Sequence, residues 1–153
     1  MRVGDPTPDP NAKRVARECL ALRVHLLNRV VTRIYDGALR PLGLTANQMS
    51  ILTVLENMTQ AQPGAIGRYL QMEKSTVSRN VKRMRQRGWV RENPGPDARS
   101  VVLAVTEKGH ALFTRVVAHW AEAQTRVREL LGDAGVTAVT GLVDRCVMSA
   151  RKA

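Results

Sequence analysis

Apolar residues recur with the period of an α-helix across the first part of the chain, from Asn11 to about Gly37. They form one row along the predicted helix and a second row beside it: Val15, Cys19, Leu22, Leu26 and Val30, then Leu20, Leu27, Val31 and Ile34. This stripe is wider than a surface helix needs for packing on a small core. The pattern therefore predicts a long helix whose apolar face has to pack against more than a small core.

The next segment predicts a helix, a tight turn and a second helix. Thr45 can cap a helix that runs to about Asn57, and Gln48 stands three residues later, as in a capping box. Pro63 suits the first position of the short helix "PGAIGRYL". The turn "QMEK" follows, and then the stretch "STVSRNVKRMRQRGWV" from Ser75.

That stretch combines a buried side with a basic side. Val77, Val81 and Met84 cluster on one side of a helical wheel. The opposite side carries polar and basic residues: Ser75, Arg79, Lys82, Arg83 and Gln86. Gly88 can adopt the left-handed conformation that ends the helix, and Trp89 then folds back onto Met84. One side of this helix packs on the protein, and the other meets solvent or a ligand.

A β-hairpin and two more helices complete the predicted order. The runs "WVRE" and "SVVLAV" are rich in β-branched residues and are separated by "NPGPDAR", which favours two strands joined by an exposed loop. Glu107 begins a helix that runs to about Leu131. Gly132 breaks it, and Asp133 can cap a final helix. We expect a mainly α fold with a small β-hairpin: a winged helix-turn-helix with terminal helices.

The apolar faces of the terminal helices exceed what the central segment can cover, so we expect a symmetric partner. We predict a flexible arm over residues 1–10 and a single domain over 11–153. Residues 11–44 and 106–153 would mainly form dimerisation helices. Residues 45–105 would form the winged helix-turn-helix lobe.

The charge of the chain indicates a polyanionic partner. Lys and Arg number 24 against 13 Asp and Glu, which gives a formal net charge of +11 and a pI near 11.0. Nucleic acid and anionic membrane both fit that charge. No long apolar run, signal peptide or lipidation motif is evident, so we predict a cytoplasmic protein without a membrane partner.

The sequence offers little for catalysis. It shows no nucleophile motif and no phosphate-binding glycine loop, and its three histidines lack metal-ligand spacing. We therefore expect no enzyme, no cofactor and no metal site. Cys19 and Cys146 lie 127 positions apart in a chain without an evident secretory signal, which argues against a disulfide framework and against a four-ligand zinc site. We expect both to be small buried residues.

At this point the chain resembles the MarR family of dimeric winged helix-turn-helix regulators, over residues 11–150. The segment "DARSVVLAVTEKG" matches the wing signature of that family, "STVSR" matches its entry to the recognition helix, and "RGWV" matches the exit. Gly67 and Gln71 depart from the residues that such motifs often carry in the turn, and Asn80 stands where an apolar residue is common.

The resemblance implies a role for each residue of the interface. Arg99 would reach the minor groove from the wing, and Asp97 would hold it in place. The major groove would be met by the recognition helix: Ser75, Thr76, Ser78, Arg79, Lys82 and Arg83. Of these, Arg79 suits a base edge because its planar fork bonds guanine bidentately, whereas Lys82 and Arg83 suit phosphates.

The resemblance also implies a repressor that binds an inverted-repeat operator in double-stranded DNA as a homodimer. A small aromatic effector would release it, and the sequence does not identify the effector-binding residues. Two alternatives stay open. Some family members sense oxidants through a cysteine in the first helix, which would give Cys19 and Cys146 a redox role. A basic RNA-associated protein is also compatible with the charge, although the aromatic content of 3% disfavours stacking on single strands.

Overall fold

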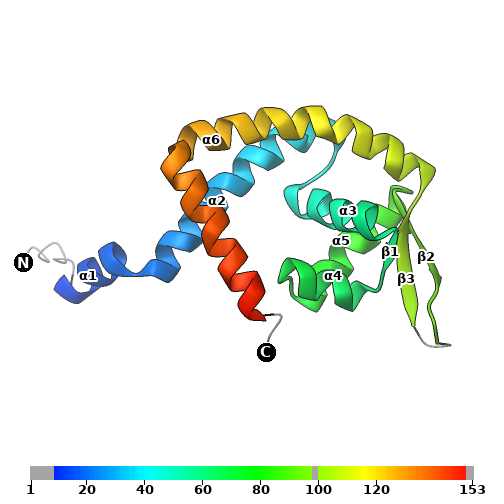
Figure 1. The fold of residues 1–153 in the computed structure, drawn as a ribbon, viewed down its shortest axis with the longest axis horizontal. Helices are drawn as coiled ribbons and strands as arrows, with labels where there is room; N and C mark the ends of the chain where they lie inside the picture. Colours follow the sequence, from blue (N-terminus) through cyan, green and yellow to red (C-terminus); the bar gives the residue numbers. More distant parts are fainter. Residues whose placement is uncertain (1–8, 98–99, 151–153) are drawn as a thin grey trace, which may run out of the picture. The chain divides into compact units, whose positions relative to one another are not determined.

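The computed structural model describes residues 9–97 and 100–150 (Figure 1). The chain forms two compact units, and the division between them falls between Arg33 and Ile34. The described part is mostly helical and contains one small antiparallel sheet, which confirms the predicted fold class. No helix in these ranges is both long enough and apolar enough to span a membrane.

The first unit begins with helix α1 (Pro10–Glu18), followed by helix α2 (Leu20–Leu39), which continues into the second unit. The side chain of Asp9 caps α1 by accepting a hydrogen bond of 2.7 Å from the amide of Asn11. We predicted an arm that extended to residue 10, but Asp9 and Pro10 already belong to the cap and first turn of α1. The remaining residues of that predicted arm, 1–8, lie outside the described residues.

The prediction of one continuous helix from Asn11 to Gly37 was wrong, because the backbone breaks at Cys19. Cys19 has an extended conformation, with φ of −68° and ψ of 109°. The guanidinium of Arg23 donates a hydrogen bond of 2.9 Å from Nε to the carbonyl oxygen of Arg17, which the break leaves without its usual helical donor. The apolar period continues on both sides of the break, so the hydrophobic pattern could not reveal it.

The second unit contains the winged helix-turn-helix. A 3-10 turn, η1 (Arg40–Leu42), leads from α2 to helix α3 (Ala46–Met58). The further elements are strand β1 (Gln60–Ala61), helices α4 (Pro63–Leu70) and α5 (Lys74–Gln86), strands β2 (Val90–Pro94) and β3 (Val101–Val105), and helix α6 (Glu107–Ala150). The capping box of Thr45 and Gln48 is present at the start of α3, as predicted.

The sheet has three strands rather than the two of the predicted hairpin. Its order is β1-β3-β2, with both pairs antiparallel, and Gln60 lies opposite Ala104. Strand β1 is only two residues long, and such a segment has no recognisable period of its own. It forms because the chain between α3 and α4 passes beside β3.

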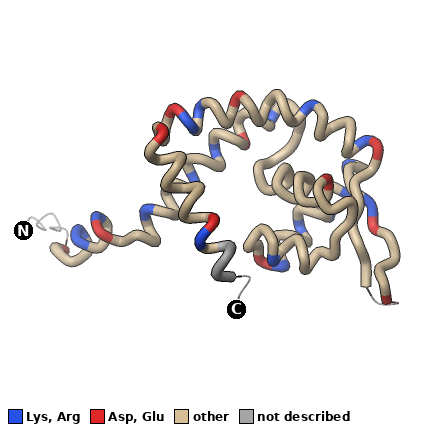
Figure 2. Tube along the Cα trace, viewed as in Figure 1, with Lys and Arg blue, Asp and Glu red and all other residues tan. Residues whose placement is uncertain are grey.

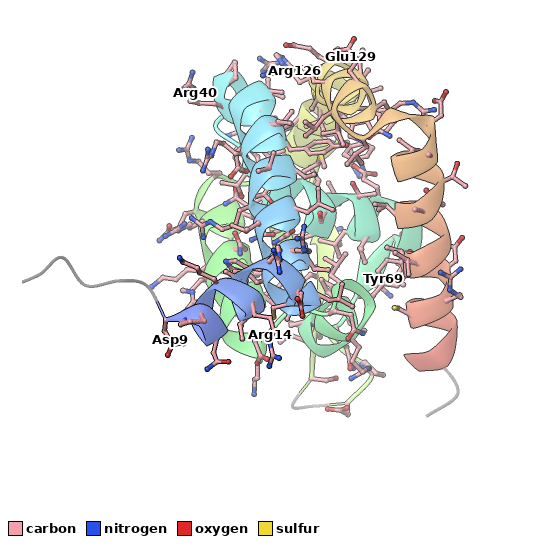
Figure 3. All side chains as sticks on the ribbon, turned by 90° about the vertical axis from the view of Figure 1, so that its left-hand side faces the viewer. Asp9, Arg14, Arg40, Tyr69, Arg126 and Glu129 are labelled. Atoms are coloured by element: carbon pink, nitrogen blue, oxygen red, sulfur yellow. The ribbon has the colours of Figure 1, made fainter. Side chains whose placement is uncertain are left out.

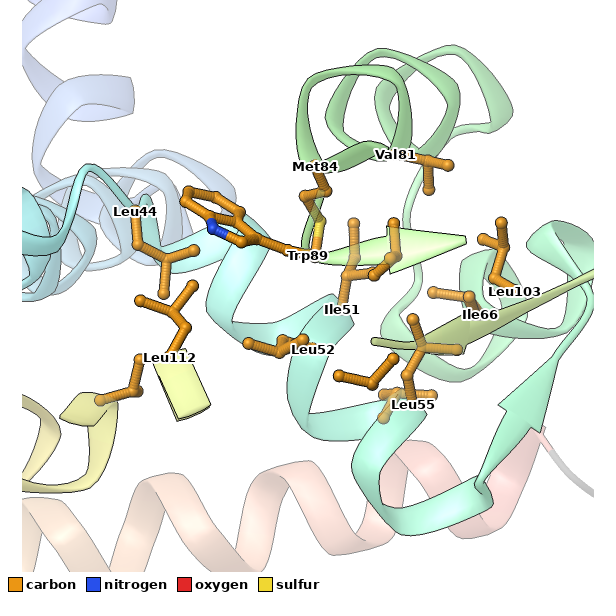
Figure 4. Close-up of a cluster of buried hydrophobic side chains, with 14 of the residues drawn as sticks. Leu44, Ile51, Leu52, Leu55, Ile66, Val81, Met84, Trp89, Leu103 and Leu112 are labelled. Carbon is orange, nitrogen blue, oxygen red and sulfur yellow. The ribbon is translucent and has the colours of Figure 1, made fainter. Parts of the chain in front are cut away.

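The core of the second unit lies between α3, α5, the sheet and the start of α6 (Figure 4). Ile51, Leu52 and Leu55 of α3 are fully buried, as is Met84 of α5. Trp89 packs in the same cluster and is 5% exposed. This core fixes the side of α5 that faces the protein.

Helix α6 is interrupted within its length. Gly132 has φ of 63° and ψ of 169°, which is not helical, so the predicted break at this residue is confirmed. Only glycine adopts this conformation without steric strain. The helical segments before and after Gly132 therefore follow different axes.

Candidate nucleic-acid interface

Helices α4 and α5 are joined by a turn that depends on the two unusual residues noted in the sequence. Gln71 ends α4 in the left-handed conformation, with φ of 52° and ψ of 41°, and its Nε2 donates to the carbonyl of Arg68 at 2.8 Å. A methyl group on Gly67 would stand 3.1 Å from the carbonyl oxygen of Met72 and 3.6 Å from Val77. Glycine at position 67 thus lets the turn pass close to α4. The side chain of Gln71 provides a donor for the carbonyl of Arg68 near the end of that helix.

The two sides of α5 differ as predicted. Val77, Val81 and Met84 are between 0% and 6% exposed. Most of the predicted DNA-contacting residues on this helix are exposed to solvent: Ser75, Ser78, Arg79, Lys82 and Arg83. Thr76 is half-buried. The fold therefore presents the polar side of α5 while its apolar side is anchored in the core.

Thr76 positions two neighbouring side chains on α5. Its Oγ1 accepts a hydrogen bond of 3.2 Å from Nη2 of Arg79, and its carbonyl oxygen accepts one of 2.9 Å from Nδ2 of Asn80. Asn80 stands where an apolar residue is common in such motifs, and this bond to the helix backbone accounts for its half-buried amide. Arg79 is thereby directed along the exposed side of the helix.

The end of α5 is a Schellman cap, which confirms the prediction for Gly88. The amide of Trp89 donates to the carbonyl of Met84 at 2.9 Å, and the amide of Gly88 donates to the carbonyl of Arg85 at 2.8 Å. Thr106 then joins this end to the start of α6, because its Oγ1 donates to the carbonyl of Gly88 at 2.6 Å. The position of the recognition helix is therefore tied to the base of the wing.

The wing is described up to Asp97 and again from Ser100, so the predicted contact residue Arg99 lies outside the described residues. Asp97 is exposed, and its carbonyl oxygen accepts a hydrogen bond of 3.1 Å from the amide of Ser100. The amide of Gly95 donates to the carbonyl of Ser100 at 2.8 Å. These bonds close the loop between β2 and β3 next to the predicted contact residue.

Three arginines at the end of α5 and in strand β2 each have a partner. Arg85 pairs with Glu92 at 2.8 Å, and the guanidinium of Arg87 lies 5.7 Å from the ring centroid of Trp89. Arg91 donates to the side chain of Asn93 at 2.9 Å. These contacts reduce the freedom of the three arginines. The side chains of Lys82 and Arg83 make no such contact with the residues that the structure describes.

A groove of about 840 Å³ runs along α4 and α5. Its walls include Lys82 and two cations that sequence reasoning missed, Arg68 of α4 and Lys74 at the start of α5. Lys and Arg recur along these helices (Figure 2). The signal that could have found Arg68 is the tight turn itself, because it brings the end of α4 beside the recognition helix.

Known proteins share this arrangement. Residues 42–100 match the family model described as the MarR family. The uncharacterized HTH-type transcriptional regulator YwoH of Bacillus subtilis (strain 168) is 28% identical over 96 residues, which cover 61% of this chain and 70% of that protein. The crystal structure of the transcriptional regulator MosR of M. tuberculosis in complex with DNA is 30% identical with a TM-score of 0.75, covering 88% of this chain and 98% of that one.

The chain belongs to the MarR family.

The likeness in fold extends to more distant members. A mutant of MarR from E. coli complexed with operator DNA has a TM-score of 0.77 at 21% identity, and the match covers 91% of this chain and 99% of that one. The protein is thus a winged-helix transcriptional regulator of the MarR family, a family of regulators rather than enzymes. Its winged helix-turn-helix carries the residues that match the family model.

This MarR-family chain also has an apolar pocket of about 470 Å³ between α3, α4 and α6. Its lining is formed by ten residues: Met49, Ser50, Thr53, Val54, Tyr69, Leu70, Phe113, Val116, Val117 and Trp120. None of these described lining residues carries a formal charge. Trp120 is 42% exposed at this pocket, so the cavity is open to solvent in the single chain.

The two cysteines of the protein differ in their exposure. Cys19 is half-buried at the helix break, whereas Cys146 is exposed, so the prediction that both are buried was wrong for Cys146. The apolar side chains around Cys146 on α6 are themselves open in a single chain. His110 is paired with Glu56, with 2.8 Å between Nδ1 and Oε1. No group of three potential metal ligands occurs among the described residues.

Proposed function

We propose that this MarR-family regulator binds double-stranded DNA as a homodimer, with α5 of each subunit in the major groove, and that it represses transcription from an inverted-repeat operator. The observation that carries this proposal is the two-sided character of α5. The side chains on its apolar side are at most 6% exposed. Its exposed side carries Arg79, Lys82 and Arg83 together with small hydroxyl residues. A helix of this kind fits the major groove while it remains part of the core.

The residues divide into two kinds of contact. Arg79 is the candidate for a base edge, because a guanidinium can bond the O6 and N7 atoms of guanine together. Lys82 and Arg83 are candidates for phosphates, and Ser75, Thr76 and Ser78 are short enough to contact either kind of group. In the wing, Arg99 is the proposed minor-groove contact and Asp97 its support.

The proposed dimer is supported by apolar side chains that a single chain leaves open to solvent. In the first unit the exposed fraction reaches 76% at Leu20 and 65% at Val24. In the second half of α6, Leu142 and Val143 are 52% and 53% exposed. Helices with such open apolar faces are typical of interfaces between subunits. A two-fold dimer would hold its recognition helices about 34 Å apart, one turn of the duplex.

The test of this function compares nucleic acids. In a gel shift, the protein should retain a duplex that contains its operator more strongly than a mixed-sequence duplex, and both more strongly than a structured RNA of equal length. Affinity should fall steeply as salt rises, because phosphate contacts release counterions. Tighter binding to the RNA would support the RNA-associated alternative and contradict the proposal.

The operator for this assay comes from selection of bound sequences out of a random pool. An inverted repeat should emerge, because a two-fold dimer reads two equivalent half-sites. A single unrepeated site, or no enriched site, would contradict sequence-specific binding by a dimer.

The apolar pocket is the candidate site for an effector that releases DNA. The resemblance implied an aromatic and often anionic ligand, but no Lys, Arg or His lines the described pocket. A buried carboxylate without a partner is costly, so the lining favours a neutral aromatic molecule over a phenolic acid. Neutral aromatic compounds should release the operator at lower concentration than their carboxylated analogues. Trp120→Ala should weaken that response, while the neighbouring His119→Ala should not.

Oxidation is the alternative trigger, through Cys19 or Cys146. The observation that favours it is the exposure of Cys146, together with Arg23 close to the break at Cys19. Peroxide treatment followed by non-reducing electrophoresis and an operator gel shift tests it. A crosslink that disappears in Cys19→Ser or Cys146→Ser, together with loss of DNA binding, would place oxidation ahead of ligand release. Unchanged binding with both thiols free would remove this alternative.

A further inference from the structure

An acidic side chain of the wing lies against the recognition helix. Oε1 of Glu92 is 2.8 Å from Nη1 of Arg85, and this contact joins β2 to α5. Glu92 follows the buried Val90 by two residues, so both side chains leave the strand on the same face. Strand β2 packs against α5. The carboxylate is therefore held beside Arg85 by the fold.

The pair lies where two hollows of the surface meet. Arg85 and Glu92 both line the groove of about 840 Å³ along α4 and α5. They also both line a second hollow of about 600 Å³ between α5 and the wing. Lys82 lines each hollow as well, and Arg91 lines the second. Glu92 is thus an anionic group among cations that face the proposed path of the DNA backbone.

We propose that Glu92 competes with DNA phosphates for Arg85 and so lowers the part of the affinity that does not depend on sequence. This inference rests on the proposed function. Glu92 occupies the Nη1 donor of Arg85, which a DNA phosphate could also use, and the negative charge of the carboxylate offsets part of the attraction of Arg85 for a phosphate. In the free protein, therefore, a duplex has to displace the carboxylate from this donor or bind an arginine whose charge the carboxylate partly offsets.

The competition acts on phosphate contacts and not on base reading. Contacts to phosphates supply most non-specific affinity, whereas Arg79 lies on the part of α5 proposed to meet base edges. An internal competitor at Arg85 weakens retention on unrelated DNA and leaves the contact of Arg79 intact. The side chains of Arg85 and Glu92 are 48% and 34% exposed, so their pairing is partly screened by solvent and its effect is modest.

The test measures the affinity of Glu92→Gln for a mixed-sequence duplex by fluorescence anisotropy. The variant should bind about two- to fivefold tighter than the parent at low salt, the range expected for loss of an exposed ion pair. Its plot of log affinity against log salt should be steeper by about 0.9 for each subunit that gains a phosphate contact. Glu122→Gln is the matched control, because it removes the same charge from an exposed position on α6 that lines neither hollow.

The effect should depend on Arg85. In an Arg85→Ala background, adding Glu92→Gln should change duplex affinity no more than Glu122→Gln does. A gain of equal size with and without Arg85, or weaker binding by Glu92→Gln, would overturn the inference. Weaker binding would mean that Glu92 positions Arg85 for a phosphate instead of withholding it. Unchanged thermal unfolding of each variant shows that the fold is retained.

A second polyanion separates this inference from the proposed function. On a heparin column, Glu92→Gln should elute at higher salt than Glu122→Gln. In the Arg85→Ala background, Glu92→Gln should raise the eluting salt concentration no more than Glu122→Gln does. If the parent protein binds no duplex at all, the proposed function fails, while the heparin result still decides whether Glu92 withholds Arg85 from an anion. Equal elution of Glu92→Gln and Glu122→Gln would overturn the inference whatever the duplex assay gives.

Discussion

Gly109 lies directly against the backbone of Trp89, so that a methyl group built on Gly109 would stand 2.1 Å from the carbonyl oxygen of Trp89. The same methyl would be 2.5 Å from Cγ1 of Val105. The amide of Gly109 donates to Oγ1 of Thr106 at 3.1 Å, and the amide of Thr106 donates to the carbonyl of Trp89 at 3.1 Å. The first turn of α6 is thus fitted onto the end of α5 and the base of the wing.

Gly109→Ala should lower the free energy of unfolding by about 1–3 kcal/mol, because backbone must move to admit the methyl group. Urea denaturation followed by circular dichroism measures this change. Gly37→Ala is the matched control, since nothing lies within 4 Å of a methyl at that helical position. It should leave stability equal or slightly higher, as alanine is the better helix former. Equal effects of the two substitutions would contradict the close fit.

Gly88→Ala should also destabilise the protein, by about 1–2 kcal/mol, because Gly88 has φ of 73° and a β-carbon is strained there. Gly88→Asn should cost less, since asparagine tolerates the left-handed conformation. The order of stability in urea should be glycine, asparagine, alanine. The same order in duplex affinity would show that this cap also positions α5 for DNA.

Arg79→Ala and Lys82→Ala should affect DNA binding differently. Loss of Arg79 should cost about 1–3 kcal/mol on the operator and relax preference at one base position of each half-site. Loss of Lys82 should weaken binding to all sequences and reduce the salt slope by about one. Arg126→Ala on α6 is the control, because Arg126, labelled in Figure 3, does not line the groove along α4 and α5. Anisotropy on operators substituted at each position distinguishes the two outcomes.

Tyr35→Phe should lower stability by about 1 kcal/mol at neutral pH, because the hydroxyl of Tyr35 donates to Oε1 of Gln124. Burial raises the pKa of Tyr35 above the ordinary value of 10.0. As the pH rises, the unfolded chain therefore loses the phenol proton before the folded protein does. The contribution of Tyr35 to the free energy of unfolding is present below pH 10.0 and is lost as the pH rises through the folded pKa.

The difference in unfolding free energy between the parent and Tyr35→Phe should consequently shrink above that pH. Tyr69→Phe serves as the control for the loss of a phenol, because Tyr69 is 55% exposed. A difference from the parent that grows with pH would contradict the burial effect.

Leu142→Lys should shift the proposed dimer towards monomer, because it places a charge in an apolar face that a second subunit would cover. Light scattering over a range of protein concentrations measures the shift. Met58→Lys is the control, since Met58 at the end of α3 is also exposed, at 44%, but lies outside the terminal helices. A monomeric parent protein would contradict the dimer itself.

The recognition helix and its ends could be predicted because they depend on residues close in sequence. The capping box joins Thr45 to Gln48 three residues on, and the Schellman cap joins Met84 to Trp89 five residues on. Their bonding partners are fixed as soon as the local backbone forms, so composition and spacing are enough. The exposed polar side of α5 follows in the same way from the helical period of Val77, Val81 and Met84.

Sequence by itself therefore determined the succession of helices, the two-sided α5 and the positive charge of this protein. Tertiary structure alone decided the contacts between segments that are distant in the chain. Strand β1 forms only because Ala61 meets Leu103, and Arg85 is neutralised only because the wing returns beside α5. The break at Cys19 also escaped the pattern, since the apolar residues keep their period on both sides of it. Such features depend on neighbours that the fold supplies, whereas a periodic pattern reports only which face of an element is buried.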